Sequence, residues 1–320
     1  MNSDFFRFKK STKLRYGENP HQEGWFSEIE DEEQDPLAIQ NFEMLQGKEL
    51  SYNNYLDMDG ALFALSHLGG KEAGCVIVKH TNPCGAALRE SLTDAYTASW
   101  YEGDPLAAFG GIMAVNREVD GSLAIQMTKN FFEVLLAPSV TKEAKIEFAK
   151  KPNIRVLVNP ALSNPSLSQA THMHKIRGGI LTMTPDIVEV SSDSIRSVTK
   201  REPTSAEIED LLFAWALCRS SKSNTVVAVK NKTLIASGVG QQDRKRCAEL
   251  CVLKAGERMK DAVAASDAFF PFRDATDVLL QAGVGAIIQP GGSVRDQESV
   301  DACDEAGVAM VYTGTRAFRH

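Results

Sequence analysis

Short apolar runs alternate with longer amphipathic stretches along most of this chain. Each run has three to five mostly apolar residues between polar or glycine-containing segments. The runs occupy residues 75–78, 112–115, 134–136, 154–158, 226–229, 286–288 and 308–312. Such runs are typical of strands buried on both faces, and their alternation with helical patterns predicts an α/β fold with a largely buried sheet.

The clearest helix is predicted over residues 206–220. Its apolar side chains recur at helical spacing and share one face: Ile208, Leu211, Leu212 and Trp215. Thr204 and Glu207 stand three positions apart at its start. This is the spacing of a capping box, in which each side chain bonds the backbone amide of the other residue, so the helix is expected to open at this pair.

Two stretches have no usable hydrophobic period. Residues 159–169 are rich in Pro, Ser and Asn, which predicts a loop. Residues 191–203 are polar and charged and come just before the strong helix. Since a chain of 320 residues is long enough for two cores, we place a domain boundary there. It divides the chain into subdomains at 1–200 and 201–320, and one half is free to contribute an element to the other.

Composition narrows the class of protein. Hydrophobic residues make up 43% and charged residues 24%, which is typical of a globular chain and excludes disordered and collagen-like ones. A formal net charge of −7 disfavours nucleic acid as the main partner, but a local basic pocket could still bind a small anion. The N-terminus lacks an apolar run of signal-peptide length, and no run elsewhere could span a membrane. We therefore expect a cytoplasmic protein without membrane attachment.

Two segments resemble variants of one unit, residues 76–96 and 286–307. In each, a buried strand is predicted to run into a Pro/Gly loop and then a helix. Such loops lie at the carboxyl ends of strands, where open α/β sheets bind ligands. One copy in each half fits an internally duplicated enzyme. Ordinary strand-to-helix turns that use glycine for tight geometry explain the pattern equally well.

The most informative cluster is KHTNPCG at residues 79–85, which places a cation, an imidazole and an amide at the end of an apolar strand. Burial beside Lys79 would keep His80 neutral, and a neutral imidazole is a competent general base near pH 7. Lys79 would then stabilise an oxyanion or protonate a leaving nitrogen. The alternative is that these polar residues at a strand end simply meet solvent.

Three further clusters are dense in polar groups. LRYGENPHQ at residues 14–22 contains Arg15, whose planar, permanently charged guanidinium suits a phosphate. SNT and GVGQQDR, at residues 223–225 and 238–244, flank predicted strands, but the third glycine of a dinucleotide fingerprint is missing, so we reject a Rossmann site. SDAFFPFRD at residues 266–274 would suit a flat heteroaromatic ligand, although core aromatics explain such a run as well.

Taken together, these runs resemble the signature of the AICAR transformylase family. This is the domain of the bifunctional purine-biosynthesis enzyme that formylates aminoimidazole carboxamide ribonucleotide (AICAR). The motifs stand in the family's order over almost the whole chain: LRYGENPHQ, KHTNPCG, DPLAAFGGI, SNTVVAVK, GVGQQDR, SDAFFPFRD, PGGSVRD and the terminal TRAFRH. An ordered series of this kind is far more specific than any one of its members.

The resemblance implies formyl transfer from 10-formyltetrahydrofolate to the 5-amino group of AICAR, without a metal, giving formyl-AICAR and tetrahydrofolate. By motif match, His80 is the proton acceptor and Lys79 stabilises the transition state. The positions that look like the nucleotide-binding set are Arg15, Tyr16, Gly110, Glu133, Asn224, Arg244, Phe269 and Arg316. Those that resemble the folate-contacting set are Asp274, Ser293 and Val294. At Glu133 the match is one of pattern only.

The resemblance also implies two cytidine deaminase-like α/β/α subdomains with the active site between them, and a homodimer whose active sites draw on both subunits. Zinc-dependent deamination is disfavoured, because Pro83-Cys84 is followed by GAA and lacks a second cysteine at the required spacing. Only thirteen residues precede the first motif, where most relatives carry an IMP cyclohydrolase domain. Ring closure to IMP is therefore expected from a separate cyclohydrolase.

Two alternatives remain open from the sequence. The same ribonucleotide could be formylated from a different one-carbon donor, such as a modified pterin, or from formate with ATP, although no P-loop is present for the latter. A protein of a different class would be a non-catalytic nucleotide-binding homologue. The presence of both Lys79 and His80 argues against that reading.

Overall fold

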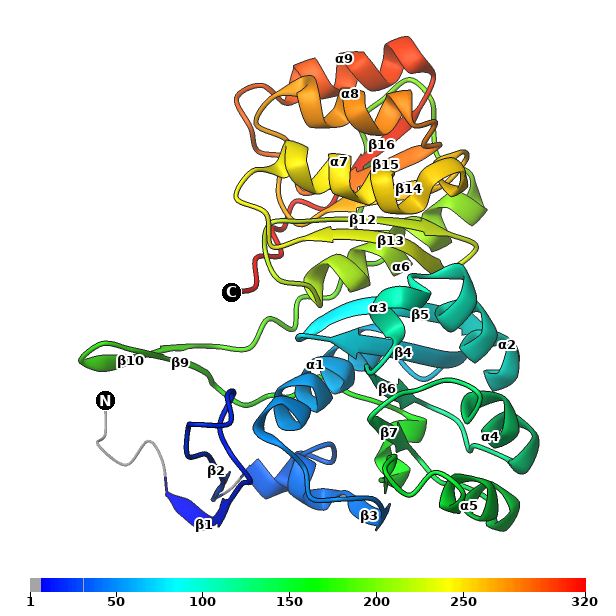
Figure 1. Ribbon diagram of the computed structural model, residues 1–320. Coiled ribbons are helices and arrows are strands. Elements are labelled where there is room, and N and C mark those ends of the chain that lie inside the picture. The colour runs from blue at the N-terminus through cyan, green and yellow to red at the C-terminus, as the bar shows by residue number, and fades with distance from the viewer. Residues whose placement is uncertain (1–6, 31) are drawn as a thin grey trace.

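The computed structural model of this chain describes residues 7–30 and 32–320. Residues 1–6, part of the N-terminal stretch that shows no signal-peptide run, lie outside the described residues. Within the described part, a twelve-stranded mixed sheet runs through the molecule and helices cover both of its faces (Figure 1). The α/β fold class expected from the sequence is confirmed.

The strands of this sheet lie side by side in an order that differs from their order in the chain. They are β11 (Arg196–Ser197), β16 (Ala309–Tyr312), β15 (Ala286–Gln289), β14 (Val263–Ser266), β12 (Thr225–Lys230), β13 (Thr233–Val239), β5 (Asn82–Arg89), β4 (Ala73–Lys79), β6 (Ile112–Val115), β7 (Val134–Ala137), β8 (Arg155–Val158) and β3 (Glu43–Gln46). Two separate hairpins pair β1 (Phe8–Lys13) with β2 (Trp25–Ile29), and β9 (His172–Ile176) with β10 (Gly179–Met183).

The helices alternate with these strands as the sequence pattern indicates. The α-helices are α1 (Tyr52–Leu68), α2 (Leu92–Thr97), α3 (Pro105–Ala108), α4 (Gly121–Met127), α5 (Lys142–Ala149), α6 (Ser205–Arg219), α7 (Arg244–Ala255), α8 (Arg273–Gln281) and α9 (Asp296–Ala306). Short 3-10 turns are η1 (Glu32–Gln34), η2 (Ile39–Asn41), η4 (Pro160–Ser163) and η5 (Gly256–Met259), and η3 (Ala98–Glu102) is a π-helical turn.

Two units of the same topology build the sheet. In each unit a long helix precedes an antiparallel hairpin, and three mutually parallel strands follow: α1, β4–β5 and β6 to β8 in the first, and α6, β12–β13 and β14 to β16 in the second. Their spatial orders correspond strand for strand, β5-β4-β6-β7-β8 and β13-β12-β14-β15-β16. The units meet where β5 runs antiparallel to β13, so corresponding strands point in opposite directions.

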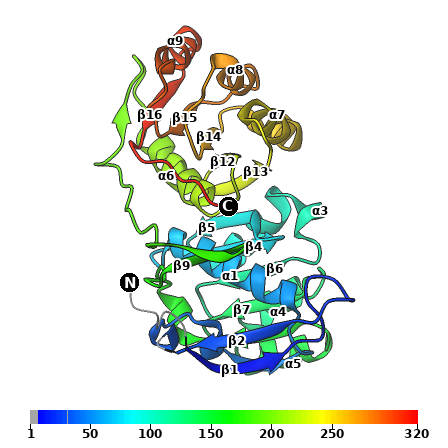
Figure 2. The same cartoon turned by 90° about the vertical axis from the view of Figure 1, so that its left-hand side faces the viewer.

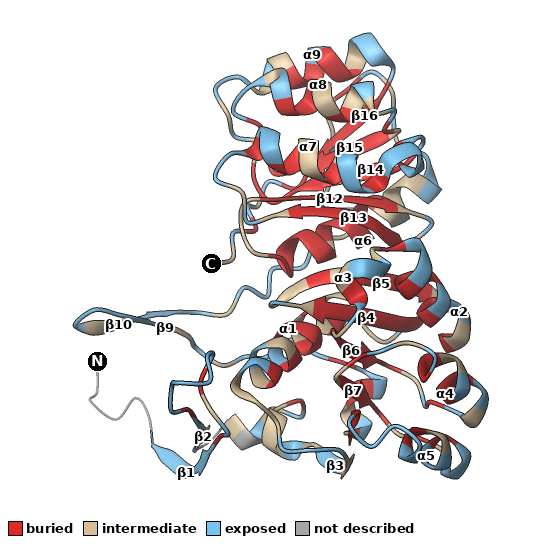
Figure 3. Ribbon diagram, viewed as in Figure 1, coloured by how far each residue is buried: buried red, intermediate tan, exposed pale blue. Residues whose placement is uncertain are grey.

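Both units share one core. On one face of the sheet, α1 and α6 contact each other, and buried side chains of both helices, such as Leu65 and Trp215, belong to a single hydrophobic cluster. On the opposite face each unit has its own cluster, beneath α2, α4 and α5 in the first and beneath α7, α8 and α9 in the second. Figure 3 shows these buried strands between the helices, whereas the β9–β10 hairpin is largely exposed.

Several local expectations are confirmed. Helix α6 opens at Thr204, and Thr204 and Glu207 form the expected capping box. Residues 159–169 form a loop apart from the short turn η4. In the predicted break at 191–203, the two residues of β11 pair with β16 of the second unit. The division of the chain at residue 200 stays a prediction.

The proposed equivalence of residues 76–96 with 286–307 is wrong. The second segment is β15, a loop and α9, as expected, but the first forms the β4–β5 hairpin before it reaches α2. The segment KHTNPCG is therefore the turn and first part of a second strand, and its counterpart is the turn between β12 and β13. The sequence did not reveal this because Pro, Gly and Ala are poor strand residues, and here they lie in a strand packed between two others.

No helix within residues 7–30 and 32–320 has the length and apolar content required to cross a membrane.

Candidate active site

Lys79 and His80 lie at the tip of the β4–β5 hairpin. Lys79 pairs with Asn82, and the two residues between them have left-handed backbones, with φ of 52° at His80 and 64° at Thr81. This is the two-residue turn that suits the twist of antiparallel strands. Asp57 of α1 accepts hydrogen bonds from the amides of His80 (3.2 Å) and Thr81 (2.6 Å).

The expectation that His80 is buried beside Lys79 is wrong. His80 is exposed and Lys79 is half-buried. The physical reason is the hairpin itself, because the two residues of a tight turn lie beyond the last ladder pair and protrude from the sheet. His80 is thus presented to solvent by a backbone that is held on the protein side by Asp57.

Lys79 extends to the start of β6. Its Nζ donates to the carbonyl oxygen of Phe109 at 2.7 Å, directly before Gly110. Gly110 has a φ of 75° and donates its amide to Phe131 at 2.9 Å, so this turn needs a residue that tolerates a left-handed backbone. The rings of Phe109 and Phe131 pack against each other at a tilt of 49°, with their centroids 5.1 Å apart. The structure therefore places the Lys79 ammonium beside the turn at Gly110.

Glu133 belongs to a network at the start of β7. It accepts from Asn54 of α1 at 2.9 Å and pairs with Arg155 at 3.7 Å, where the Arg155 side chain is only 9% exposed. Burial lowers the pKa of Arg155, Glu133 raises it, and the nearby charge of Arg15 lowers it again. Arg15 itself is exposed and its guanidinium lies over the ring of Tyr16, 5.0 Å from the centroid. Glu133 is thus held in place and is not a freely solvated strand edge.

The second unit contributes a buried charge network. Arg244, the first residue of α7, donates to Asp267 at 2.7 Å, to Asn224 at 2.9 Å and to Ser266 at 2.8 Å. The Asp267 side chain is fully buried, and its second oxygen accepts from the hydroxyl of Ser223 at 2.6 Å. Two of the sequence clusters, the one at residues 223–225 and 238–244 and the one at residues 266–274, therefore meet around one ion pair.

Backbone contacts join this network to the Lys79–His80 turn. The amide of Lys222 donates to the Asn82 side chain at 2.8 Å. Arg319, in the C-terminal run, donates to the carbonyl oxygens of Ser220 (2.9 Å) and Thr81 (3.4 Å). Arg316 lies in the same terminal segment, where it is exposed and stacks on Phe318 at 4.4 Å.

The folate-type positions lie further along the second unit. Asp274 is exposed in the first turn of α8 and accepts from the Ala275 amide at 2.8 Å. In the loop after β15, the Ser293 hydroxyl accepts from the amide of Arg295, and Val294 is fully exposed. The Arg295 guanidinium lies over the Phe272 ring at 5.0 Å, which joins this loop to the segment before α8. Phe269, at the start of that segment, is half-buried.

All of these groups lie along one edge of the sheet, which faces the viewer in Figure 2. In the second unit they follow the carboxyl ends of β14, β15 and β16, where open α/β sheets usually bind ligands. In the first unit Gly110 and Glu133 instead precede β6 and β7. The opposed direction of the two units explains the difference, since it places the amino ends of one set of parallel strands beside the carboxyl ends of the other.

Three residues that these networks depend on, Asn54, Asp57 and Arg155, were not picked out from the sequence, and Asp267 was noted only as a member of the SDAFFPFRD cluster, without a role of its own. Their partners lie far away in the chain, so no local spacing indicates them. For Asp57 a signal does exist, because Asp210 occupies the same position, the sixth residue, in α6 as Asp57 does in α1. The repeat would have revealed it once the two long helices had been aligned.

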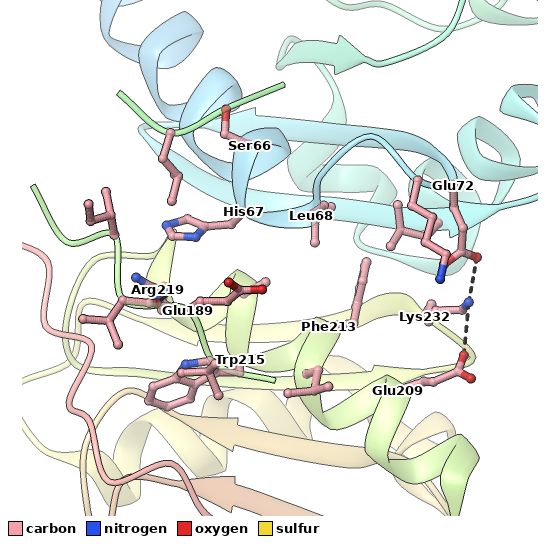
Figure 4. A pocket seen from close by; sticks show the side chains of 18 residues that line it. Ser66, His67, Leu68, Glu72, Glu189, Glu209, Phe213, Trp215, Arg219 and Lys232 are labelled. Atoms are coloured by element: carbon pink, nitrogen blue, oxygen red, sulfur yellow. Dashed lines mark hydrogen bonds and ion pairs between the residues drawn. The ribbon is translucent and has the colours of Figure 1, made fainter. Parts of the chain in front are cut away.

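A cavity of about 780 Å³ lies elsewhere, between α1 and α6 (Figure 4). It is lined by His67, Trp215 and Arg219 among others, and none of the site residues predicted from the sequence lines it. Burial lowers the pKa of His67 to about 3. The chemistry-bearing motifs therefore lie along an open sheet edge and not in this cavity.

Among residues 7–30 and 32–320, no group of three or more His, Cys, Asp or Glu side chains is placed to hold a metal ion.

Comparisons with known proteins agree with the motif match. The family model described as AICARFT/IMPCHase bienzyme matches residues 2–254. Proteins named bifunctional purine biosynthesis protein PurH are similar over 98% of this chain, with 44% identity in Aquifex aeolicus and 44% in Polynucleobacter asymbioticus. The chain spans about three fifths (60%) of the length of these relatives. Among solved structures, Acinetobacter baumannii RibD, form 2, matches 28% of this chain and 29% of that chain at 17% identity, with a TM-score of 0.24.

Proposed function

We propose, from the premise that this chain belongs to the AICARFT/IMPCHase bienzyme family, that it transfers the formyl group of 10-formyltetrahydrofolate to the 5-amino group of AICAR. The products are formyl-AICAR and tetrahydrofolate. One observation carries the proposal: Lys79 and His80, the pair that the motif match assigns to catalysis, lie at the tip of a tight turn whose backbone is tied to α1.

His80 is proposed to act as the base. The lone pair of the AICAR amine is delocalised into the ring and its carboxamide, so the amine attacks well only as its proton leaves. The amine nitrogen bonds the formyl carbon while its proton passes to the imidazole. The bond between the formyl carbon and N10 of the folate then breaks, and N10 takes up a proton. Imidazole is the side chain that changes charge most readily around neutral pH.

Lys79 is proposed to stabilise the charge that develops on the formyl oxygen. A fixed ammonium lowers the energy of an oxyanion more than a mobile one does, because it need not reorganise during the reaction. The 2.7 Å contact between Lys79 Nζ and the Phe109 carbonyl supports this role, since it holds the ammonium beside the turn at Gly110. In this proposal the Lys79 ammonium also donates the proton that the leaving N10 takes up.

The nucleotide is proposed to bind across both units. Arg15, Arg244 and Arg316 are the cations of the assigned set, and a phosphate is well matched by guanidinium groups. Glu133 and Asn224 would bind hydroxyl or amide groups of the ribonucleotide, and both are already oriented by hydrogen bonds to the protein. The folate would contact Asp274, Ser293 and Val294, with the half-buried Phe269 beside the substrate ring.

A homodimer whose active sites draw on both subunits is also proposed. The β9–β10 hairpin extends from the body on the side of the sheet edge that carries the predicted site residues, here called the motif edge (Figures 1 and 2). One face of β10 exposes two large apolar side chains, Leu181 at 57% and Met183 at 66%. Exposed apolar groups gathered on a protruding element mark a protein interface. A partner subunit seated there would lie next to the motif edge.

Light scattering tests the dimer. We expect the wild-type protein to have twice the chain mass of 35.0 kDa and a Leu181→Glu variant to be a monomer with reduced turnover. Thr182→Glu is the matched control, because it places the same charge on the opposite face of β10. A monomeric wild-type protein with full turnover would contradict this part of the proposal.

The central test follows tetrahydrofolate formation from AICAR and 10-formyltetrahydrofolate. The wild-type protein should turn over, with IMP formed only once a cyclohydrolase is added. His80→Ala should lower kcat by about 10²- to 10⁴-fold, the usual contribution of a general base, while calorimetric AICAR binding persists. Lys145→Ala, which removes an exposed side chain from α5, outside both the predicted site and the β9–β10 hairpin, is the control and should keep its activity. Full activity of His80→Ala would disprove the role of the base.

The same assay separates the alternatives. Turnover only with a modified pterin, or with formate and ATP, would assign a different one-carbon donor. AICAR binding without turnover by any donor would assign a non-catalytic nucleotide-binding protein.

A further inference from the structure

We propose that Asp57 is the positioning residue of the candidate active site. Its carboxylate fixes the Lys79–His80 turn in the geometry that presents both side chains to the substrates, an inference that rests on the proposed formyl transfer. Asp57 lies on α1, on the protein side of the turn, and reaches it through the backbone amides of His80 and Thr81. It touches the backbone of the turn, so it acts through His80 and Lys79.

The turn needs such an anchor. His80 and Thr81 both have left-handed backbones, which are unfavourable for residues with a Cβ and most of all for a β-branched residue such as Thr81. Turns of this type usually carry Asn-Gly or Gly-Gly. The sequence here instead has His-Thr, a pair that is less favourable for the left-handed backbone of the turn but places an imidazole at its tip. Two charge-assisted hydrogen bonds, which the Asp57 carboxylate accepts from the turn amides at 3.2 and 2.6 Å, offset that cost.

The second unit contains the same aspartate anchor, but its turn lacks the Lys-His pair. Asp210 of α6 accepts from the amides of Asn231 at 2.8 Å and Lys232 at 2.6 Å, and these two residues have φ of 52° and 49°. Their turn joins β12 to β13 as the first joins β4 to β5. It carries no histidine, and the Lys232 ammonium pairs with Glu72 at 2.6 Å. The aspartate is thus a part of the repeated fold, and only Asp57 anchors a turn that bears the catalytic pair.

Asparagine cannot replace this anchor. Asp57 uses both carboxylate oxygens, one for each amide. An asparagine has one oxygen and one NH2 group, so one turn amide would lose its acceptor and face a second donor. The carboxylate is half-buried, and Glu133 and His80 are the charged or titratable groups whose fields reach it. On the carbonyl side of the turn, Asn82 donates to the His80 carbonyl at 2.8 Å and Arg319 donates to the Thr81 carbonyl at 3.4 Å, and neither contact replaces an acceptor for the two amides.

The experiment compares Asp57→Asn with Asp210→Asn in the full chain. Each substitution removes one half of the same two-amide anchor, so both should lower the unfolding midpoint by a similar amount. Only Asp57→Asn should lower kcat, by about 10- to 100-fold, because misplacing a catalytic group by about 1 Å has this effect. The KM for AICAR should stay within about threefold, because the assigned phosphate ligands are not moved. Equal kcat values for the two variants would overturn the proposal.

Two further measurements keep the test decisive. Thr81→Gly relieves the left-handed backbone without restoring the carboxylate, so Asp57→Asn/Thr81→Gly should recover stability and part of the lost kcat. No recovery of kcat in a well-folded double variant would overturn positioning through the turn.

Amide hydrogen exchange at His80 and Thr81 should accelerate about tenfold in Asp57→Asn and remain unchanged in Asp210→Asn. If the wild-type protein shows no turnover, the proposed function fails, and unchanged exchange at these amides would then overturn the anchor itself.

Discussion

Arg244 and Asp267 show how a single buried pair shapes the site at the residue scale. Asp267 is fully buried and Arg244 is 8% exposed at the side chain, and their 2.7 Å contact is supported by Asn224, Ser223 and Ser266. A buried charge is tolerated only when it is paired and hydrogen-bonded. The pair therefore holds the guanidinium in one orientation and makes the region intolerant of change.

Asp267→Asn should destabilise the protein by about 3–5 kcal/mol, because it leaves the Arg244 charge buried without a counter-ion. Urea unfolding monitored by circular dichroism measures this loss. Glu249→Gln breaks the ion pair between Arg246 and Glu249 on the outer side of α7, where the Arg246 side chain is 68% exposed. That control should change stability by about 0.5 kcal/mol or less. A similar effect for both variants would contradict the burial argument.

Cys84, which lies close to the Lys79–His80 turn in the chain, should be chemically inert. Burial raises the pKa of Cys84 to about 12, and burial raises the thiol pKa of the other five cysteines as well. Since only the thiolate reacts, little reactive thiol is present at neutral pH, and the fraction grows as the pH approaches these pKa values. At pH 8 a thiol reagent should modify the native protein slowly and all cysteines promptly after denaturation. Rapid loss of activity by modification of Cys84 in the native state would contradict this.

At the scale of elements, a helix approaches the second strand of each hairpin at a glycine. A Cβ on Gly85 of β5 would lie 2.2 Å from the Ser99 carbonyl oxygen in η3, and a Cβ on Gly238 of β13 would lie 2.0 Å from the Cys247 carbonyl oxygen in α7. Both neighbours are backbone atoms, which cannot rotate away. The position of α7, and hence of Arg244 at its start, depends on this contact.

Gly238→Ala should therefore push α7 away from β13 and destabilise the protein by about 1–3 kcal/mol or more, as overpacking does. AICAR affinity should fall as well, because Arg244 moves with the helix. Thermal unfolding and calorimetry measure the two effects. Gly179→Ala on the exposed β10 strand has open space around the added methyl group and should be close to neutral. An unchanged Tm for Gly238→Ala would show that the helix can shift without cost.

The whole molecule consists of two units of the same topology that share a hydrophobic core. The two units meet where β5 pairs with β13 in the middle of the sheet. They also share the hydrophobic cluster between α1 and α6, in which Leu65 and Trp215 are buried together. Neither long helix could bury its apolar face without the other unit. The molecule should therefore unfold as one body even though its chain is built as a repeat.

We expect a single cooperative transition for both units at fixed protein concentration. Trp100 lies in the core of the first unit and Trp215 in the shared core. Trp25 is the third tryptophan, so it is replaced in both variants. Urea unfolding of Trp25→Phe/Trp100→Phe followed by the fluorescence of Trp215, and of Trp25→Phe/Trp215→Phe followed by that of Trp100, should each give a midpoint that coincides with that of circular dichroism for the same variant. Separate fluorescence and circular dichroism midpoints would show that the units unfold independently.

The sequence by itself determined the elements that depend on local pattern. The apolar run at residues 112–115 is β6 without change, and the capping box at Thr204 marks the start of α6. Both are local effects, since a strand buried on both faces must be continuously apolar and a helix end needs a partner for its free amides. The order of the motifs likewise indicated the family, because that information lies in the chain alone.

Only the tertiary structure decided how the motifs come together. The hairpin strands β5 and β13 lack a clear apolar pattern, because small residues there admit helices that approach the sheet closely. The opposed direction of the two units then places motifs that are more than 200 residues apart, such as Lys79 and Arg316, along one edge. The anchor at Asp57 and the exposure of His80 follow from that arrangement, because a contact between distant segments is set by packing and leaves no mark on local spacing.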